Sequence, residues 1–135
     1  MDKTSESIIV KCLRSHFPGL RMVYLFGSAA ADQLRADSDI DIAFLTVHAV
    51  NAADIFQISG ELATQLKRDV DLVDMKSAST VFRAQIIHTG RRLYCADEYD
   101  CDTYADYAFS SYAHLNEERQ AILNDIQQRG SVYGG

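Results

Sequence analysis

A glycine and a serine stand at a fixed spacing before two aspartates, in the pattern GS-x10-DxD. Gly27 and Ser28 directly follow the apolar run of residues 22–26, which predicts a buried strand. The pair then ends the strand and opens a short alanine-rich helix. The Ser28 hydroxyl and the free backbone N–H groups at such a helix start can bind a phosphate group. The first half of the pattern therefore predicts a strand, a phosphate-binding turn and a helix.

The two aspartates of the pattern lie in a segment in which polar and apolar residues alternate. Asp39 and Asp41 fall on one face of the strand predicted near residues 39–46, while Ile40 and Ile42 fall on the other. Two neighbouring carboxylates repel each other unless a cation lies between them. Hard oxygen ligands of this kind suit Mg²⁺, which proteins usually share with the phosphates of a substrate. The second half therefore predicts a metal-binding strand with an apolar back.

A third aspartate, Asp71, stands in another alternating segment, predicted as a strand near residues 69–74. By the two-residue period, Asp71 shares a face with Asp69 and Val73. Taken alone, it would be interpreted as a solvated carboxylate at a strand edge, and Asp69 and Asp74 are assigned to that class. Beside the first two aspartates, it completes a cluster of carboxylates on rigid strands.

Together, GS-x10-DxD and the later strand aspartate resemble the signature of the DNA polymerase beta-like nucleotidyltransferases. Within that superfamily, the small size and the stretches SDIDIAF and RDVDLVDM are most similar to the minimal nucleotidyltransferases (MNT), in particular to antitoxins that pair with HEPN-domain toxins. The resemblance covers roughly residues 5–95. It implies a polymerase beta-like fold of the α/β (α+β) class, with a small mixed central sheet flanked by helices.

The resemblance also implies a site that uses ATP as substrate and two Mg²⁺ ions. Asp39, Asp41 and Asp71 would be the catalytic and metal-binding residues. The first two would hold both ions with the triphosphate, and Asp71 would complete the ion nearest the nucleophile and help to remove its proton. Gly27 would let the backbone approach the β- and γ-phosphates, to which Ser28 would hydrogen-bond.

The chain departs from the family pattern directly after the glycine and serine. Members often carry an arginine there, in a GS-x-AR pattern, whereas residues 29–32 are Ala-Ala-Ala-Asp here. An anionic triphosphate therefore lacks one expected neutralising charge. Arg35, Lys76 and Arg83 are candidates for that role, and the sequence alone does not place them. The departure bears on substrate affinity more than on the class of reaction.

Composition and charge restrict the class of protein further. A chain of 135 residues forms one domain that can bury a core. Its net charge of −6 at pH 7, with no basic stripe, argues against direct binding of nucleic acid. It has no apolar run of about 18 residues, and its N-terminal MDKTSES does not resemble a signal peptide. Cys12, Cys95 and Cys101 are odd in number and lack CxxC spacing, so we expect reduced thiols in a cytoplasmic protein without membrane contact.

The remaining periodicity predicts alternating helices and strands followed by a long terminal helix, near residues 99–129. The first helix ends at Pro18-Gly19, a second lies near residues 51–67, a third is capped by Ser77 or Ser79 and ends at Gly90, and Leu93-Tyr94 can add an edge strand. The buried side of the second helix is predicted to hold Ala53, Phe56, Ile58, Leu62 and Leu66. We expect a nucleotidyltransferase core over residues 1–96 and an acidic helix with a tail over residues 97–135, within one domain.

The C-terminal segment is acidic and rich in tyrosine. Residues 97–118 hold seven Asp or Glu and no Lys or Arg, and five of the seven tyrosines lie between positions 94 and 112. The helix either packs its tyrosines on the chain's own core, or presents them with its acids to a basic partner. Three- and four-residue steps predict one helical stripe, formed by Tyr104, Ala108, Tyr112, Leu115, Ile122 and Ile126.

Three functions stay open at this point. The resemblance implies an antitoxin enzyme that transfers AMP from ATP to a tyrosine hydroxyl of a cognate HEPN RNase toxin, in a hetero-oligomer. The same fold could instead neutralise the toxin by binding and occlusion, with little catalysis. An intact Gly27-Ser28 and all three aspartates favour the enzyme, because binding alone does not require them. Transfer to a small molecule is disfavoured, since only about 35 residues follow the core and leave no domain to hold the acceptor.

Overall fold

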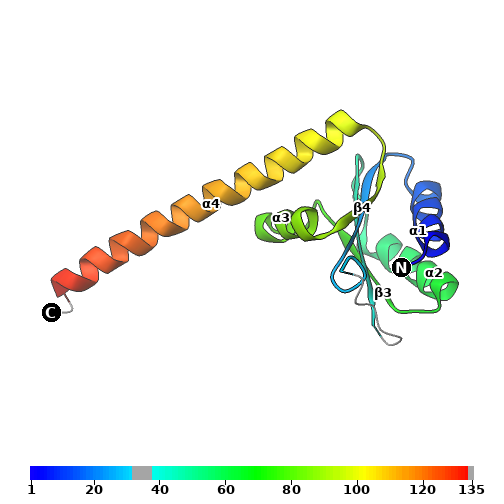
Figure 1. Cartoon of the computed structure of the whole chain (residues 1–135), viewed down its shortest axis with the longest axis horizontal. Helices are drawn as coiled ribbons and strands as arrows, with labels where there is room; N and C mark the ends of the chain where they lie inside the picture. Colours follow the sequence, from blue (N-terminus) through cyan, green and yellow to red (C-terminus); the bar gives the residue numbers. More distant parts are fainter. Residues whose placement is uncertain (32–37, 134–135) are drawn as a thin grey trace.

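The computed structural model describes residues 1–31 and 38–133, with side chains up to residue 128, and has a mixed four-stranded sheet between two layers of helices (Figure 1). The strand order is β3-β2-β1-β4. β1 is antiparallel to both β2 and β4, whereas β2 and β3 are parallel. The predicted fold class is confirmed. The elements are α1 (Lys3–His16), β1 (Leu20–Phe26), β2 (Ile40–Thr46), α2 (Ala52–Leu66), β3 (Val70–Asp74), α3 (Thr80–Thr89), β4 (Arg91–Cys95) and α4 (Glu98–Tyr133).

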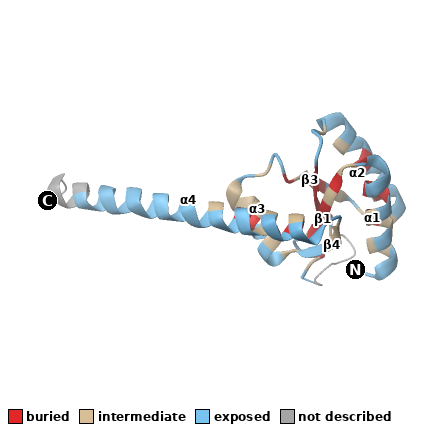
Figure 2. Cartoon of the chain, turned by 90° about the horizontal axis from the view of Figure 1, so that it is seen from above, coloured by how far each residue is buried: buried red, intermediate tan, exposed pale blue. Residues whose placement is uncertain are grey.

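Alternation along the strands divides the core into two layers. α1 and α2 cover the face of the sheet that carries Ile40 and Ile42 of β2. α3 and the first part of α4 cover the face that carries Ala43 and Leu45. Buried residues gather where these helices meet the sheet (Figure 2). By the two-residue period, Asp41 belongs to the face of Ala43 and Leu45, as the sequence predicted.

Side-chain caps fix where three of the helices begin. Asp2, Asn51 and Ser79 each accept a hydrogen bond from the backbone N–H three residues further along the chain. Of the two serines considered for the third helix, Ser79 is therefore the cap and Ser77 is not. The same helix ends at Gly90, as predicted.

Two predicted core positions on α2 are wrong. Phe56 is 82% exposed and Ala53 is also exposed, whereas Ile58 and Leu62 are buried and Ile55 packs against the same core. The buried stripe runs through positions that recur every three or four residues. Phe56 lies one residue beside that stripe, about 100° further round the helix, and therefore points to solvent.

α4 leaves the sheet after its first part and projects away from the other elements (Figures 1 and 2). Cys101 and Ala108 are buried, and Tyr104 packs against the same core. Further along, Ile122 and Ile126 are 60% and 59% exposed. The predicted stripe does lie on one face of a helix. In the described part of the chain, however, only the first residues of that face pack against other elements. Although α4 is long, neither it nor another helix of the described residues combines the length and apolar character needed to cross a membrane.

The start of α4 is attached to the sheet by an ion pair and a disulfide. Arg21 of β1 donates two hydrogen bonds to the carboxylate of Asp100, at 2.8 and 2.7 Å. Cys95, at the end of β4, is bonded to Cys101, so the expectation of three reduced thiols is wrong. Only Cys12 is free, and it is buried. Sequence spacing could not reveal the pair, because a strand end and a helix start meet only in the folded chain, with Cα atoms 6.5 Å apart.

Candidate active site

The two halves of the GS-x10-DxD pattern meet at the end of β1. Phe26 pairs with Asp41 in the antiparallel register of β1 and β2, so the next residue, Gly27, lies beside that aspartate. Gly27 has a φ of 66°, a conformation that side chains disfavour. A Cβ atom at this position would overlap Oδ2 of Asp41. A glycine is therefore required here both for its backbone conformation and for its lack of a side chain.

Gly27 opens a turn, and the short helix predicted from the alanines is not present over the described residues of this segment. The N–H of Ala31 donates to the Gly27 carbonyl at 3.3 Å, closing a single turn. Ala29 is buried in the core and anchors this turn, which leaves Ser28 half-buried at its rim. The rest of the predicted helix falls on residues 32–37, which lie outside the described residues.

β2 and β3 bring the three predicted carboxylates to one corner of the sheet. Asp41 and Asp71 are paired in the parallel register, which places their backbones about 5 Å apart on neighbouring strands. Asp39 directly precedes β2. Asp39 and Asp71 are exposed, whereas Asp41 is half-buried. The carboxylates therefore stand at the same corner as Gly27.

The electrostatics of this corner fit a divalent cation. Burial, followed by the negative charges of Asp71 and Asp39, raises the pKa of Asp41. The two neighbouring carboxylates thus disfavour the charged form of Asp41. The donor atoms are all oxygens carried on or beside two paired strands, which is the donor set that Mg²⁺ prefers. The residues present therefore fit the metal that the sequence predicted.

Lys76 and Arg83, two of the three basic residues proposed to replace the missing arginine, do not lie at this corner. Lys76 donates to the carbonyl of Val47 at 2.7 Å, just beyond the end of β2, whereas Asp41 lies near its beginning. The strand between them spans about 20 Å. Arg83 donates to the carbonyl of Lys76 at 2.7 Å and is held near the same end. Arg35 lies outside the described residues.

Arg68 is a basic residue near the carboxylates that sequence reasoning missed. Its guanidinium donates to the carbonyl of Ser38 at 3.4 Å, and Ser38 is the residue directly before Asp39. A signal for this placement was available in the sequence. Arg68 comes just before the strand of Asp71, and two parallel strands that pair in register begin at the same edge of a sheet.

The two aspartates that were assigned no catalytic role have structural ones. The backbone carbonyl of Asp69 accepts a hydrogen bond from the N–H of Ile40 at 2.9 Å, which joins the beginnings of β2 and β3. The side chain of Asp74 accepts from the N–H of Lys76 at 3.0 Å and closes the turn after β3. Both interactions hold the strands that carry the site.

Comparison with known proteins identifies relatives that share the whole site region. Residues 8–99 match the family model described as polymerase beta, nucleotidyltransferase. The chain is 39% identical over 126 residues to the protein adenylyltransferase MntA of Shewanella oneidensis, covering 93% of this chain and 90% of that protein.

Solved structures of similar chains have the same fold. A chain in the crystal structure of a toxin–antitoxin with AMP-PNP is 39% identical, with a TM-score of 0.81 over 90% of this chain and 98% of that one. A chain in the complex of a tri-AMPylated Shewanella oneidensis HEPN toxin with MNT antitoxin is 38% identical, with a TM-score of 0.78 over 94% and 99%. The matched family region contains the turn at Gly27 and all three aspartates. The chain therefore belongs to the polymerase beta nucleotidyltransferase family.

Proposed function

We propose that this chain is an antitoxin that transfers AMP from ATP to a tyrosine hydroxyl of a cognate HEPN-domain toxin. The observation that carries the proposal is the meeting of the Gly27-Ser28 turn with Asp39, Asp41 and Asp71 at one corner of the sheet. The choice of substrates is supported by relatives at 38–39% identity, which include a protein adenylyltransferase and an MNT antitoxin complexed with an AMPylated HEPN toxin. The proposal places the protein in the cytoplasm, where ATP is available.

In this proposal the turn after β1 binds the triphosphate. The open backbone at Gly27 lets the β- and γ-phosphates approach, and the Ser28 hydroxyl donates to a phosphate oxygen. Asp39, Asp41 and Asp71 would hold two Mg²⁺ ions, which when bound neutralise charge on the attacking and leaving oxygens. Because these three residues stand on or directly beside paired strands, the sheet fixes where their backbones lie.

The transfer is an in-line displacement at the α-phosphorus of ATP. The tyrosine oxygen forms a bond to that phosphorus, the bond to the oxygen that bridges to the β-phosphorus breaks, and diphosphate leaves with the bridging oxygen. Asp71 accepts the proton of the tyrosine hydroxyl. Asp71 is exposed on β3, which is an outer strand of the sheet, so an acceptor on a partner protein can reach it from the open edge.

Arg68 supplies a positive charge beside the phosphates. Its contact with the Ser38 carbonyl places the guanidinium next to the residue that precedes Asp39. Guanidinium groups match phosphate oxygens in a bidentate geometry. If the Arg68 side chain rotates from the Ser38 carbonyl toward the triphosphate, its charge takes the place of the arginine that is absent after Ser28.

The projecting part of α4 is the surface that we assign to the toxin. Its apolar edge consists of Ile122, Leu123 and Ile126, which lie within two helical turns and are exposed. No residue from 116 to 128 is buried in this chain. An apolar edge on a helix is a common way to engage a protein groove. The related antitoxin chain matched over 94% of this sequence, and so over most of α4, occurs in a complex with its toxin.

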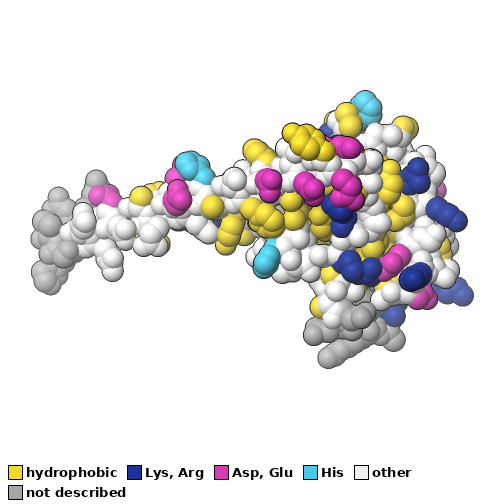
Figure 3. Space-filling view, turned by 45° about the horizontal axis from the view of Figure 1, so that its top comes forward, with side chains coloured by type: hydrophobic (Ala, Val, Ile, Leu, Met, Phe, Trp, Pro, Cys, Tyr) yellow, Lys and Arg dark blue, Asp and Glu magenta, His cyan; other side chains and the backbone are white. Residues whose placement is uncertain are grey.

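The acids nearer the sheet divide into two groups. One group makes contacts within this chain. The Asp97 side chain accepts a hydrogen bond at the start of α4, and Glu98 and Asp100 form ion pairs with arginines of the strands. Asp102 and Asp106 are exposed, in the part of α4 where acidic side chains lie in a row (Figure 3). An RNase toxin needs a basic face to bind RNA, and negative charge on α4 would attract that face.

Neutralisation by binding alone is the second candidate function, and the absence of an arginine from residues 29–32 is the observation that favours it, because the triphosphate lacks one expected neutralising charge. Both candidates use the same docking surface, and they differ in whether the aspartates are needed. Transfer to a small molecule is less well supported, since the relatives include a protein adenylyltransferase.

The deciding experiment uses the chain purified together with the product of its neighbouring gene, which the proposal expects to be a HEPN polypeptide. Mg²⁺ and ATP labelled on its α-phosphate are added, and intact mass and peptide fragmentation identify the labelled residue. We expect AMP on a toxin tyrosine and a loss of RNase activity. The double substitution Asp39→Asn with Asp41→Asn is the matched control and should bind toxin without labelling it. Silencing of the toxin without a gain in mass would support occlusion and overturn the enzyme.

A further inference from the structure

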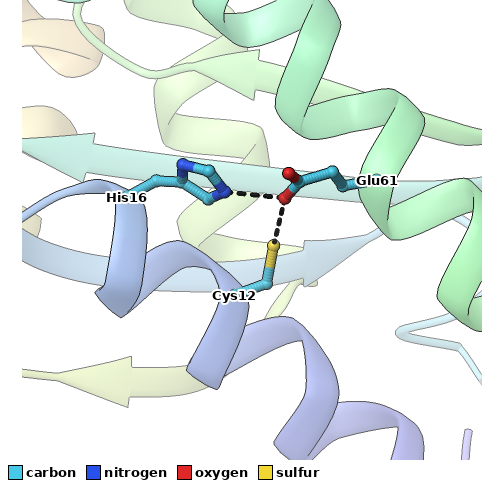
Figure 4. A group of neighbouring side chains, drawn as sticks. All are labelled: Cys12, His16 and Glu61. Atoms are coloured by element: carbon cyan, nitrogen blue, oxygen red, sulfur yellow. Dashed lines mark hydrogen bonds and ion pairs between the residues drawn. The ribbon is translucent and has the colours of Figure 1, made fainter.

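A second group of chemically reactive side chains lies on the other face of the sheet, where α1 packs beside α2. Cys12 and His16 stand one turn apart on α1, and Glu61 reaches them from α2 (Figure 4). All three side chains turn toward one another. None of them has a part in the proposed transfer of AMP, because the aspartates belong to the opposite face.

The separations within this group are short. His16 Nε2 lies 2.7 Å from Oε2 of Glu61, and Cys12 Sγ lies 3.8 Å from the same oxygen. One ligand atom from each residue lies within 4.8 Å of the other two. Around a tetrahedral zinc ion, with bonds of about 2.0–2.3 Å, neighbouring ligand atoms are about 3.3–3.8 Å apart. The group therefore needs only small side-chain movements to surround an ion.

The donor atoms are one sulfur, one nitrogen and one oxygen. Thiolate and imidazole select zinc and related transition-metal ions, whereas Mg²⁺ prefers oxygen alone. The corner of Asp39, Asp41 and Asp71 offers only oxygens, so the two groups would take different metals. Three protein ligands with an open fourth position are typical of accessible zinc sites.

The surroundings of His16 leave room for a water molecule as a fourth ligand. Cys12 is 8% exposed and closes the inner side of the group, while the His16 and Glu61 side chains are 32% and 43% exposed. A cavity of about 200 Å³ opens beside His16 and is lined also by Asp54 and Gln57. It is large enough to hold water next to the imidazole.

We propose that Cys12, His16 and Glu61 bind a divalent transition-metal ion of the zinc type, with water from the adjacent cavity as the fourth ligand. The ion takes the place of the Cys12 thiol proton, which is released to solvent, and it joins α1 to α2. The unfolded chain does not hold these side chains together, so binding adds to the stability of the fold. A plain ion pair between His16 and Glu61 would not need the thiol, which makes Cys12 the discriminating residue.

Co²⁺ is the probe, because thiolate ligation gives charge-transfer absorption and a tetrahedral site gives intense visible bands. The titration uses the full chain with its Cys95–Cys101 disulfide intact, in excess Mg²⁺ that occupies the aspartates. We expect bands that saturate at one equivalent and disappear when Zn²⁺ is added. Cys12→Ser should abolish the charge-transfer band. His16→Ala should weaken binding by at least about tenfold, since loss of even an outer-shell partner costs 10–100-fold.

The matched control is His114→Ala. His114 also forms a one-turn ion pair, with Glu118 at 3.0 Å, but lies far along α4 from Cys12, the free thiol. This variant should keep full Co²⁺ binding. Zn²⁺ should raise the melting temperature of the wild type and of His114→Ala but not that of His16→Ala, and this comparison decides the matter if Cys12→Ser does not fold. Absence of charge-transfer absorption in the wild type, or equal Zn²⁺ stabilisation of His16→Ala, would overturn the proposal.

Discussion

Gly27 and Asp41 lie so close together that a single methyl group on the glycine would overlap the carboxylate. The pairing of Phe26 with Asp41 in the sheet produces this contact, so the register of β1 and β2 brings the two halves of the GS-x10-DxD pattern together. The turn that we propose for phosphate binding and the strand that we propose for metal binding are consequently in direct contact. A change at either residue should disturb both functions.

The first prediction tests this contact with Gly27→Ala. We expect AMP transfer to fall by orders of magnitude, since the new methyl group displaces the Asp41 side chain. The free energy of unfolding should also fall, by about 1–2 kcal/mol for the left-handed backbone alone. Gly60→Ala is the control, because Gly60 lies inside α2 with open space around it. That variant should gain about 0.5–1 kcal/mol and keep full activity.

The second prediction concerns the carboxylates themselves. Asp39→Asn with Asp41→Asn should abolish transfer, because the donor set for the metal is lost. In buffer without divalent cations, the same protein should melt no lower than the wild type, since like charges have been removed from one corner. Asp69→Asn is the control, because only its backbone carbonyl makes a contact between the strands. Near wild-type labelling by the double variant would mean that the site lies elsewhere.

The third prediction follows from the raised pKa of Asp41, which burial and the charges of Asp71 and Asp39 produce. The folded chain keeps the carboxyl proton of Asp41 to a higher pH than the unfolded chain does, because aspartates in an unfolded chain have a pKa of about 3.9. The contribution of the protonated Asp41 side chain to the free energy of unfolding is therefore fully present at low pH. It is lost as the pH rises through the pKa that Asp41 has in the folded chain. Without divalent cations, Asp41→Asn should melt progressively higher than the wild type as the pH is raised. A constant difference at every pH would contradict the assignment.

The fourth prediction assigns Arg68 to the triphosphate. Arg68→Ala should raise the KM for ATP by about tenfold or more, because a hydrogen bond to a charged group contributes about 1.5–3 kcal/mol. Arg68→Lys should restore part of the affinity, since it keeps the charge without the bidentate geometry. Lys76→Ala is the control at the far end of β2 and should leave the KM unchanged. Equal KM values for all four proteins would assign the missing charge to another residue.

The fifth prediction separates steering from anchoring on α4. Asp102→Lys with Asp106→Lys should slow association with the toxin, and the slowing should shrink at high salt. Ile122→Ala with Ile126→Ala should instead speed dissociation. Neither pair should lower the melting temperature, because all four residues are exposed. Phe56→Ala, at an exposed apolar residue of α2, is the control for the apolar change. Surface plasmon resonance and melting curves on the same proteins test each claim.

Local patterns were sufficient to predict most of the fold. The alternation around Asp41 and Asp71 indicates which face of each strand is buried. The Ser79 side chain accepts a hydrogen bond at the start of α3, and the Gly90 N–H donates one at its end, each with a partner three or four residues away. The fixed spacing of the motif selected the candidate site residues, whose roles stay predictions.

Two features that sequence reasoning missed depend on how the elements meet in the folded chain. Arg68 reaches Ser38 only because β2 and β3 are neighbours, and Cys95 reaches Cys101 only because α4 turns back over the sheet. Phe56 was assigned to the core because apolar character alone does not specify which side of a helix a residue occupies. Ile126 shows the same limit of sequence patterns. It continues the apolar stripe of α4, but it lies beyond the part of the helix that the sheet covers and is exposed.

The projecting half of α4 has a consequence for the lifetime of the protein. A helix gains little stability from its own hydrogen bonds in water, and most helices depend on packing against a neighbour. Over residues 116–128, no side chain is buried in this chain. This stretch should therefore open locally and be cut by proteases before the sheet is. A partner seated on Ile122 and Ile126 would protect it, so the abundance of free antitoxin would fall whenever its toxin is scarce.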